Sequence, residues 1–230
     1  GESWVYGKKS IDPSTPMRFW QRPEEVSFIL DSLAKKTLFN VQLETDSVVM
    51  LGHSSGGFTA LAMVGARLEA GKSQNYCQSE HSKGDLGCRY GSQTRAQPLT
   101  ETQIKTIEAY QESMQDSRIV SAVALDPAIG HASSEESLSN IKVPTLIIGS
   151  VDNDFLPFDI HAKYYAAHIP KAQLIGLAQG AGHFVYIDSC DSERKAQGVP
   201  LCIDRDGVDR KALQQQILSY VFTFIYNQGL

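Results

Sequence analysis

The chain has 230 residues, of which 42% are hydrophobic and 20% are charged, and its formal net charge is −5 at pH 7. This is the composition of a globular protein that is long enough to bury a substantial core. Because the sequence has no run of Lys and Arg and no apolar stretch of roughly 20 residues, we expect neither a nucleic-acid partner nor a transmembrane segment.

The first predicted elements are a helix, a strand and a second helix. Residues 22–37 (RPEEVSFILDSLAKKT) place Pro23 at a first helical position, acidic residues in the first turn and apolar residues along one face. The segment 47–52 (SVVMLG) is short, β-branched and apolar on both faces, which is typical of a buried parallel strand. Residues 57–71 (GFTALAMVGARLEAG) then predict a helix that ends near Gly71.

The rest of the chain continues the alternation of strands and helices. A polar region follows at about 72–98, and Thr100 to Gln103 has the form of a capping box that opens a helix running to Met114. Three further strands and two helices are expected, the strands at 118–126, 143–150 and 172–178 and the helices at 158–168 and 210–226. This order predicts an α/β fold built on an open, mostly parallel sheet with helices on both faces.

The four cysteines indicate disulfides. Each close pair lies in a polar, loop-like stretch, and the spacings lack the C-x-x-C pattern of a zinc site. Of the three possible pairings we favour Cys77–Cys88 with Cys190–Cys202, each closing a loop worth about 3 kcal/mol in the chain-entropy model. Disulfides favour an oxidising compartment, so a secreted or periplasmic protein is expected.

A G-x-S-x-G motif occurs as Gly52-His53-Ser54-Ser55-Gly56. The motif alone is a weak signal, but here a buried strand leads into it and a helix follows, which is the setting of a nucleophile elbow. The interpretation as a turn that merely needs glycine competes with it. If the elbow is real, Ser54 is the nucleophile and the backbone N–H of Ser55, at the helix N-terminus, contributes to the oxyanion hole.

A serine hydroxyl needs a base, and we expect His183 to provide it. His183 lies in a Gly-rich loop, LAQGAGHFVYID, directly after the last apolar strand, from which an imidazole can reach back over the sheet. The other five histidines are interpreted as structural or as solvated. His53 should point away from the nucleophile, His81 and His131 lie in polar loops, and His161 and His168 lie on a helix with a solvated face.

The acid that orients the imidazole has more than one candidate. Asp126 follows one strand, and Asp152 and Asp154 follow the next, so each gives the order serine, acid, histidine. The later strand usually carries the acid in such sheets, and Asp152 stands nearest its end. We therefore favour Asp152, with Asp126 as the main alternative and Asp154 as the third.

Several motifs in order resemble the α/β-hydrolase superfamily: RPEEVSFILDSL, VVMLGHSSGGFTALAMVGA, AVALDPAIG, VPTLIIGSVDNDFLP and GAGHFVYIDSC. More narrowly, they resemble predicted dienelactone hydrolases related to plasma-type platelet-activating factor acetylhydrolases, and more distantly cutinase-like polyester hydrolases. The resemblance implies a serine esterase with Ser54 as nucleophile and His183 as base. It leaves the acid open, because the acetylhydrolase relatives use an aspartate matching Asp126 and the cutinase-like relatives use one in the segment 152–154.

The resemblance also has a departure: strands normally precede the elbow strand in this fold, and none is found before residue 47. We expect a single catalytic domain over 1–230 that lacks its N-terminal strands. The resemblance implies a small-molecule or lipid-like ester as substrate, with no cofactor and no metal. A catalytically silent binding module and a serine peptidase or amidase are the alternatives. The oligomeric state is not predicted, and Phe58, Phe155, Phe158 and Phe184 are candidates for either an acyl site or the core.

Overall fold

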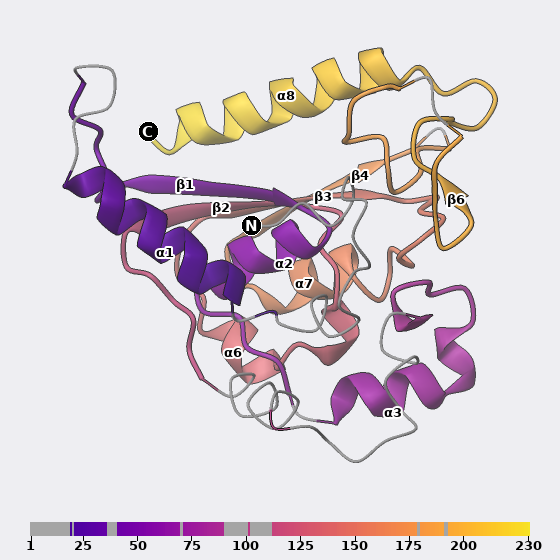
Figure 1. Cartoon of the computed structure of the whole chain (residues 1–230), viewed down its shortest axis with the longest axis horizontal. Coiled ribbons are helices and arrows are strands. Elements are labelled where there is room, and N and C mark those ends of the chain that lie inside the picture. The colour runs from indigo at the N-terminus through magenta and orange to yellow at the C-terminus, as the bar shows by residue number, and fades with distance from the viewer. Residues whose placement is uncertain are drawn as a thin grey trace.

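In a computed structural model of the chain, the residues described are 19, 21–35, 41–69, 71–89, 101, 112–178, 180–190 and 193–230. Four parallel strands form the central sheet in the order β1-β2-β3-β4 (Figure 1). Their bounds are Val48–His53 for β1, Ile119–Leu125 for β2, Thr145–Ser150 for β3 and Ala172–Leu177 for β4. The predicted parallel α/β sheet is therefore confirmed.

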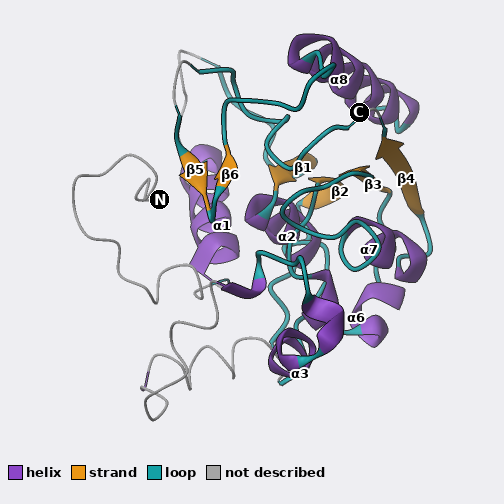
Figure 2. Ribbon diagram, turned by 90° about the vertical axis from the view of Figure 1, so that its right-hand side faces the viewer, coloured by secondary structure: helices purple, strands orange, loops and turns teal. Residues whose placement is uncertain are grey.

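Helices cover both faces of this sheet. Figures 1 and 2 show α8 (Arg210–Asn227) on one face and α2 (Ser55–Ala62) and α7 (Ala162–His168) on the other. The remaining helices are α1 (Gln21–Ala34), α3 (Lys72–Gln78) and α6 (Glu135–Ser139), with short 3-10 turns at Glu80–Ser82 and Gly130–Ala132. A small antiparallel pair, β5 (Lys195–Ala196) and β6 (Val199–Pro200), precedes α8.

Each face of the sheet has its own apolar core. One core joins α1, α2 and α7 to the sheet, and Phe58 and Tyr165 are among its fully buried side chains. The other lies under α8, whose predicted apolar face is confirmed, since Leu213, Ile217 and Phe224 are all buried. Strand β3 is buried along its whole length, as expected of a central parallel strand.

Parallel strands bring their carboxyl ends to one edge of the sheet. In register, His53 pairs with Leu125 and Ser150 pairs with Leu177, so the loops after β1, β2, β3 and β4 leave the sheet side by side. These loops carry the residues that the sequence singled out as functional. Among the described strands, β1 pairs only with β2, and the strand predicted to be buried at 47–52 is instead partly exposed, with Leu51 47% exposed.

Some predicted boundaries were wrong. The helix expected over 57–71 begins at Ser55 and ends at Ala62. It stops because Gly65 has a left-handed φ of 121° and the N–H of Ala66 turns back to the carbonyl of Leu61. The helix expected from 158 begins only at Ala162. The predicted capping box and the helix after it lie mostly outside the described residues.

Both favoured disulfides are present. The Cα atoms of Cys77 and Cys88 are 5.5 Å apart, and those of Cys190 and Cys202 are 5.2 Å apart. Among the described residues, no helix has the length and apolar character needed to span a bilayer.

Candidate active site

Ser54 occupies the sharp turn between β1 and α2. Its backbone has a positive φ of 57° with ψ −119°, a conformation that costs a non-glycine residue about 1–3 kcal/mol. The N–H of Ser54 continues the sheet by bonding to the carbonyl of Leu125 at 2.9 Å, and its carbonyl accepts the N–H groups of Phe58 and Ala128. These bonds hold the strained turn in place.

Two glycines make this turn sterically possible. A Cβ on Gly52 would overlap the carbonyl oxygen of Gly56, so the next-to-last residue of β1 has to lack a side chain. A Cβ on Gly57 would lie 3.0 Å from the Cα of Pro127, in the loop after β2. The second glycine therefore lets the start of α2 approach the loop that carries Asp126.

His183 reaches Ser54 from the loop after β4. Its Nε2 lies 3.0 Å from Ser54 Oγ, a hydrogen-bond distance, and the residue is only 1% exposed. The structure thus brings together the two residues predicted as nucleophile and base, although 129 positions separate them in the sequence.

The His183 ring is held on several sides. Phe155 stacks on it with centroids 5.1 Å apart and planes inclined by 14°. The backbone N–H of His183 donates to Asp154 Oδ1 at 2.9 Å, and its carbonyl accepts from His53 Nε2 at 2.9 Å. His53, interpreted from the sequence as structural, thus packs against the predicted base.

The three candidate acids lie in different places. Asp126 Oδ2 is 3.6 Å from His183 Nδ1, and Asp126 Oδ1 accepts the N–H of Ser150 at 2.8 Å. Asp152 is turned the other way, with its carboxylate accepting the N–H of Gly180 at 3.1 Å. Asp154 bonds to the backbone of His183 and not to its ring. Asp126 is the candidate whose carboxylate faces Nδ1.

Asn153 was not identified from the sequence. Its side-chain nitrogen lies 3.3 Å from His183 Nδ1, and its side-chain oxygen accepts the N–H groups of Phe155 and Leu156. The only signal in the sequence is its position between two candidate acids, directly after β3. A polar residue at that point is also ordinary loop composition.

Burial dominates the electrostatics of the site. It lowers the pKa of His183 to about 3, so this imidazole is neutral at pH 7 and can accept a proton. It raises the pKa of Asp126 to about 7, against hydrogen bonding from Ser150 and, less strongly, from the Asn153 amide, which favours the carboxylate. Within the described residues, Asp126 Oδ2 is a buried oxygen without a hydrogen-bond partner. An uncompensated carboxylate oxygen beside an imidazole would stabilise positive charge there.

Other predicted groups surround this centre. Ser55 is the first residue of α2, and the first N–H groups of a helix have no partner within it. Phe155 and Phe184 contact the ring of His183, whereas Phe58 is fully buried in the core. Phe158 packs against the same core.

An apolar cluster beside His183 connects the two disulfide-closed loops. Phe155 and Leu156 are buried in it, and Leu86 from the first loop and Val199 from the second pack against them. The N–H of Leu86 donates to the carbonyl of Phe155 at 2.9 Å. Both loops therefore support the segment that stacks on His183.

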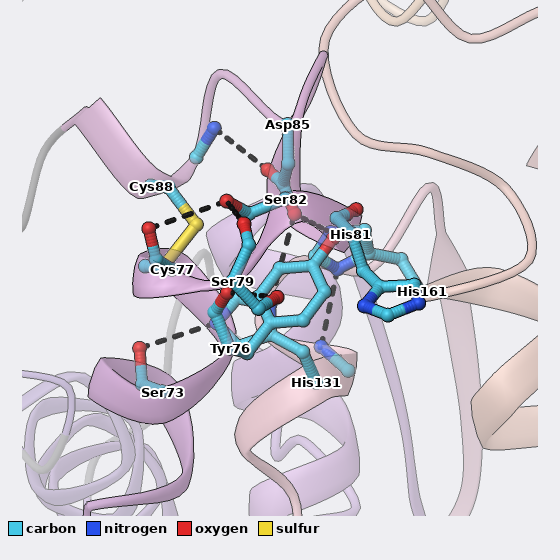
Figure 3. The surroundings of a disulfide bond; sticks show 12 residues. Ser73, Tyr76, Cys77, Ser79, His81, Ser82, Asp85, Cys88, His131 and His161 are labelled. Atoms are coloured by element: carbon cyan, nitrogen blue, oxygen red, sulfur yellow. Dashed lines mark hydrogen bonds and ion pairs between the residues drawn. A yellow bond between two sulfur atoms is a disulfide. The ribbon is translucent and has the colours of Figure 1, made fainter.

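A second histidine cluster lies next to the Cys77–Cys88 disulfide (Figure 3). His161, expected on a solvated face, is instead 2% exposed, and its Nε2 lies 2.8 Å from Asp85 Oδ2. The nearest nitrogen of His131, Nδ1, is 3.8 Å from the same oxygen. The N–H of Gly130 donates to His161 Nδ1 at 3.1 Å, so the ring proton of the neutral imidazole is on Nε2 and points at Asp85.

The three side chains Asp85, His131 and His161 are close enough to share a metal ion. They are poorly suited to do so, because a metal-bound histidine normally donates its other ring N–H outward. Here His161 Nδ1 accepts a hydrogen bond from Gly130 instead. The same tautomer leaves His161 without a free lone pair for base catalysis.

Comparisons with known proteins give only distant likenesses. No protein-family model matches the sequence, and no curated protein is significantly similar to it. A predicted CIB-like hydrolase from Thermoplasma acidophilum is 13% identical with a TM-score of 0.46, over 94% of this chain and 67% of that one. A putative lipase from Acinetobacter baumannii is 14% identical with a TM-score of 0.44, over 96% and 73%.

The carboxylesterase CesB from Bacillus subtilis is likewise 13% identical with a TM-score of 0.37, over 86% of this chain and 65% of that one. Each of these proteins is described as a hydrolase, lipase or esterase. Similarity at this level does not indicate an activity for this chain. Any inference about activity has to rest on the geometry of its own residues.

Proposed function

We propose that the protein is a serine-dependent carboxylic ester hydrolase of the α/β-hydrolase type, with Ser54 as nucleophile, His183 as base and Asp126 as the acid. The observation that carries the proposal is the 3.0 Å contact between His183 Nε2 and Ser54 Oγ at a strained strand–turn–helix junction. A strained backbone and a buried imidazole on a serine hydroxyl have no evident structural purpose.

Catalysis begins with proton transfer from Ser54 Oγ to His183 Nε2. The oxygen then bonds to the ester carbonyl carbon, and the carbonyl oxygen becomes an oxyanion held by backbone N–H groups that include Ser55. The oxyanion returns its electron pair, the bond to the alkoxy oxygen breaks, and His183 gives its proton to the leaving alcohol. An acyl-enzyme on Ser54 remains.

Water completes the cycle. His183 takes a proton from the water, whose oxygen bonds to the acyl carbon and forms a second oxyanion. This intermediate collapses with release of the carboxylic acid, and the proton on His183 returns to Ser54. No cofactor and no metal takes part in these steps.

Asp126 replaces the initially favoured Asp152 as the proposed acid. Its unpaired oxygen faces His183 Nδ1, and it is buried where a negative charge acts strongly on the imidazolium. The carboxylate of Asp152 is engaged with Gly180. An acid after β2 matches the acetylhydrolase-like members of the resemblance, and we propose that branch for this chain. Because it carries two disulfides, we also propose secretion or a periplasmic location.

The proposed substrate is a small or lipid-like ester. Phe155 and Phe184 contact the ring of His183, and Ala128 packs in the same apolar cluster, which suits an apolar acyl or alkyl group. A matched pair of ester and anilide substrates separates an esterase from a peptidase or amidase.

A fluorophosphonate probe is expected to label Ser54, and Ser54→Ala is expected to lower the turnover of a short-chain aryl ester by about 10⁶-fold. The matched control is Ser139→Ala, because Ser139 is an exposed serine whose hydroxyl bonds only within its own helix. The peptide that carries the label is identified by mass spectrometry. Retained turnover in Ser54→Ala, or no hydrolysis of any activated ester by the wild-type protein, refutes the esterase and favours a binding module.

A further inference from the structure

Asp126 and Asn153 both lie next to His183 Nδ1, and they require opposite protonation states of that nitrogen. Asp126 Oδ2, at 3.6 Å, can only accept a hydrogen bond when ionised, so it needs a proton on Nδ1. The side-chain nitrogen of Asn153, at 3.3 Å, can only donate, so it needs Nδ1 to be free of a proton. The two contacts cannot both be made.

The orientation of the Asn153 amide is set by its other end. Its oxygen accepts the N–H of Phe155 at 2.9 Å and that of Leu156 at 2.8 Å. Two backbone N–H groups cannot bond to an amide nitrogen, so the flipped amide is excluded. Its N–H₂ group therefore points toward His183, and it also lies close enough to Asp126 to act on that carboxyl and lower its pKa.

The consequence for the base follows from the two imidazole tautomers. With Asn153 bonded to Nδ1, the ring proton of neutral His183 is on Nε2, where it points at Ser54 Oγ, and the base has no lone pair there. With Asp126 bonded to Nδ1–H, Nε2 is free to take the serine proton. Distances of 3.3 Å and 3.6 Å place the described structure nearer the first state.

We propose that Asn153 is a positioning residue that shares His183 Nδ1 with Asp126 and holds the base in its idle tautomer until Asp126 takes over that nitrogen. This inference rests on the proposed function, since it concerns the readiness of the same base. Asn153 does not touch the reacting atoms and acts only through the imidazole. Position 153 is consequently a second location from which a carboxylate would reach Nδ1.

The first test is a direct reading of the tautomer. The ¹⁵N shifts of the His183 ring, assigned by their loss in His183→Gln, report which nitrogen carries the proton. The wild-type protein at pH 8.5 is expected to carry it on Nε2, and Asn153→Asp is expected to move it to Nδ1. The same tautomer in both proteins overturns the proposal, whether or not the protein hydrolyses esters.

The second test moves the carboxylate between the two positions. Asp126→Asn is expected to lose activity, and the double variant Asp126→Asn with Asn153→Asp is expected to recover at least tenfold over it. The substituted carboxylate can still accept from Phe155 and Leu156, so the loop contacts are kept. The matched control adds Asp159→Asn to Asp126→Asn, since Asp159 is exposed on the same loop.

These outcomes separate the inference from the proposed function. If wild-type protein fails to hydrolyse esters, the function fails and the tautomer measurement still decides the role of Asn153. If the wild type is active but the double variant stays at the level of Asp126→Asn, the role of Asn153 is refuted and the esterase stands. Circular dichroism checks that each variant is folded.

Discussion

In the described part of the chain, the buried pairs Asp85–His161 and Asp126–His183 differ in what the second ring nitrogen of the histidine contacts. In the pair near the first disulfide, His161 Nε2 lies 2.8 Å from Asp85, and His161 Nδ1 accepts the N–H of Gly130. In the pair at the sheet edge, His183 Nδ1 lies 3.6 Å from Asp126, and His183 Nε2 faces Ser54 Oγ.

This difference shows that a buried Asp–His pair is not by itself a catalytic device. Both nitrogens of His161 are engaged with fixed partners, and the pair ties the disulfide loop to the loop after β2. His183 instead turns one nitrogen to a hydroxyl on a strained turn. A proton can be exchanged there once Nδ1–H is bonded to Asp126 in place of the Asn153 amide.

The largest expected difference between the pairs is in rate. Asp126→Asn is expected to lower kcat about 10⁴-fold, because an amide cannot stabilise the imidazolium and favours the wrong tautomer. KM should change little, since Asp126 does not bind substrate. Steady-state hydrolysis of an aryl ester measures both constants.

The control for the effect of Asp126→Asn on kcat is His161→Gln, which alters the other Asp–His pair. Its kcat per folded molecule should stay within a few-fold of the wild-type value. Asp152→Asn tests the acid that the sequence favoured. A loss of four orders of magnitude in Asp152→Asn, with an active Asp126→Asn, would reverse the assignment.

The second expected effect is a loss of stability in acid, about 3 kcal/mol between pH 7 and pH 5. Burial lowers the pKa values of His53 and His183 to about 3 and that of His131 to about 4. Below pH 6.5 the unfolded chain therefore takes up protons that the folded protein does not, and the free energy of unfolding falls.

Asp126 opposes part of this trend. Its folded pKa is raised to about 7 by burial, so over the same range the folded protein binds a proton that the unfolded chain does not. Urea unfolding at a series of pH values measures the net effect. A free energy of unfolding that is flat or rising from pH 7 down to pH 5 would contradict the lowered pKa values of these three histidines.

The smallest of the three effects is the removal of the structural pair. Asp85→Ala is expected to cost about 2 kcal/mol, because it leaves the buried N–H groups of His161 and Gly87 without acceptors. Burial raises the pKa of Asp85, but the hydrogen bond from His161 and the electrostatic attraction of His161 and His131 outweigh it, so the pKa lies below its usual range. Unfolding in urea at pH 7 gives the value, and exposed Asp159→Ala should stay within about 0.5 kcal/mol.

The sequence carried enough information to predict the sheet and two members of the site. The position of Ser54 was predictable because an apolar strand pattern, small residues and a helix pattern are all local features of 47–62. His183 was predictable because its loop follows the last strand. The helix end after Ala62 was missed, because Gly65 lies inside a segment whose apolar pattern continues beyond it.

The aspartate that faces His183 could not be chosen from the sequence. Asp126 and Asp152 both follow strands, and only the backbone decides which way each side chain turns. Asp126 has a positive φ of 39° and faces inward, whereas Asp152 bonds to Gly180 in a loop 28 positions away. The burial of His161 was missed for the same reason, since its partner Asp85 is 76 positions distant.

The apolar cluster at Phe155 has a practical consequence for anyone who prepares this protein. Both cystine-closed loops rest on that cluster, and they are also joined by a bond from Arg89 to the carbonyl of Gln197 at 3.4 Å. Protein produced in a reducing host would lack the two disulfides that support the segment next to His183. Thiol titration should therefore accompany each activity assay, because preparations with different disulfide content would differ in structure next to His183.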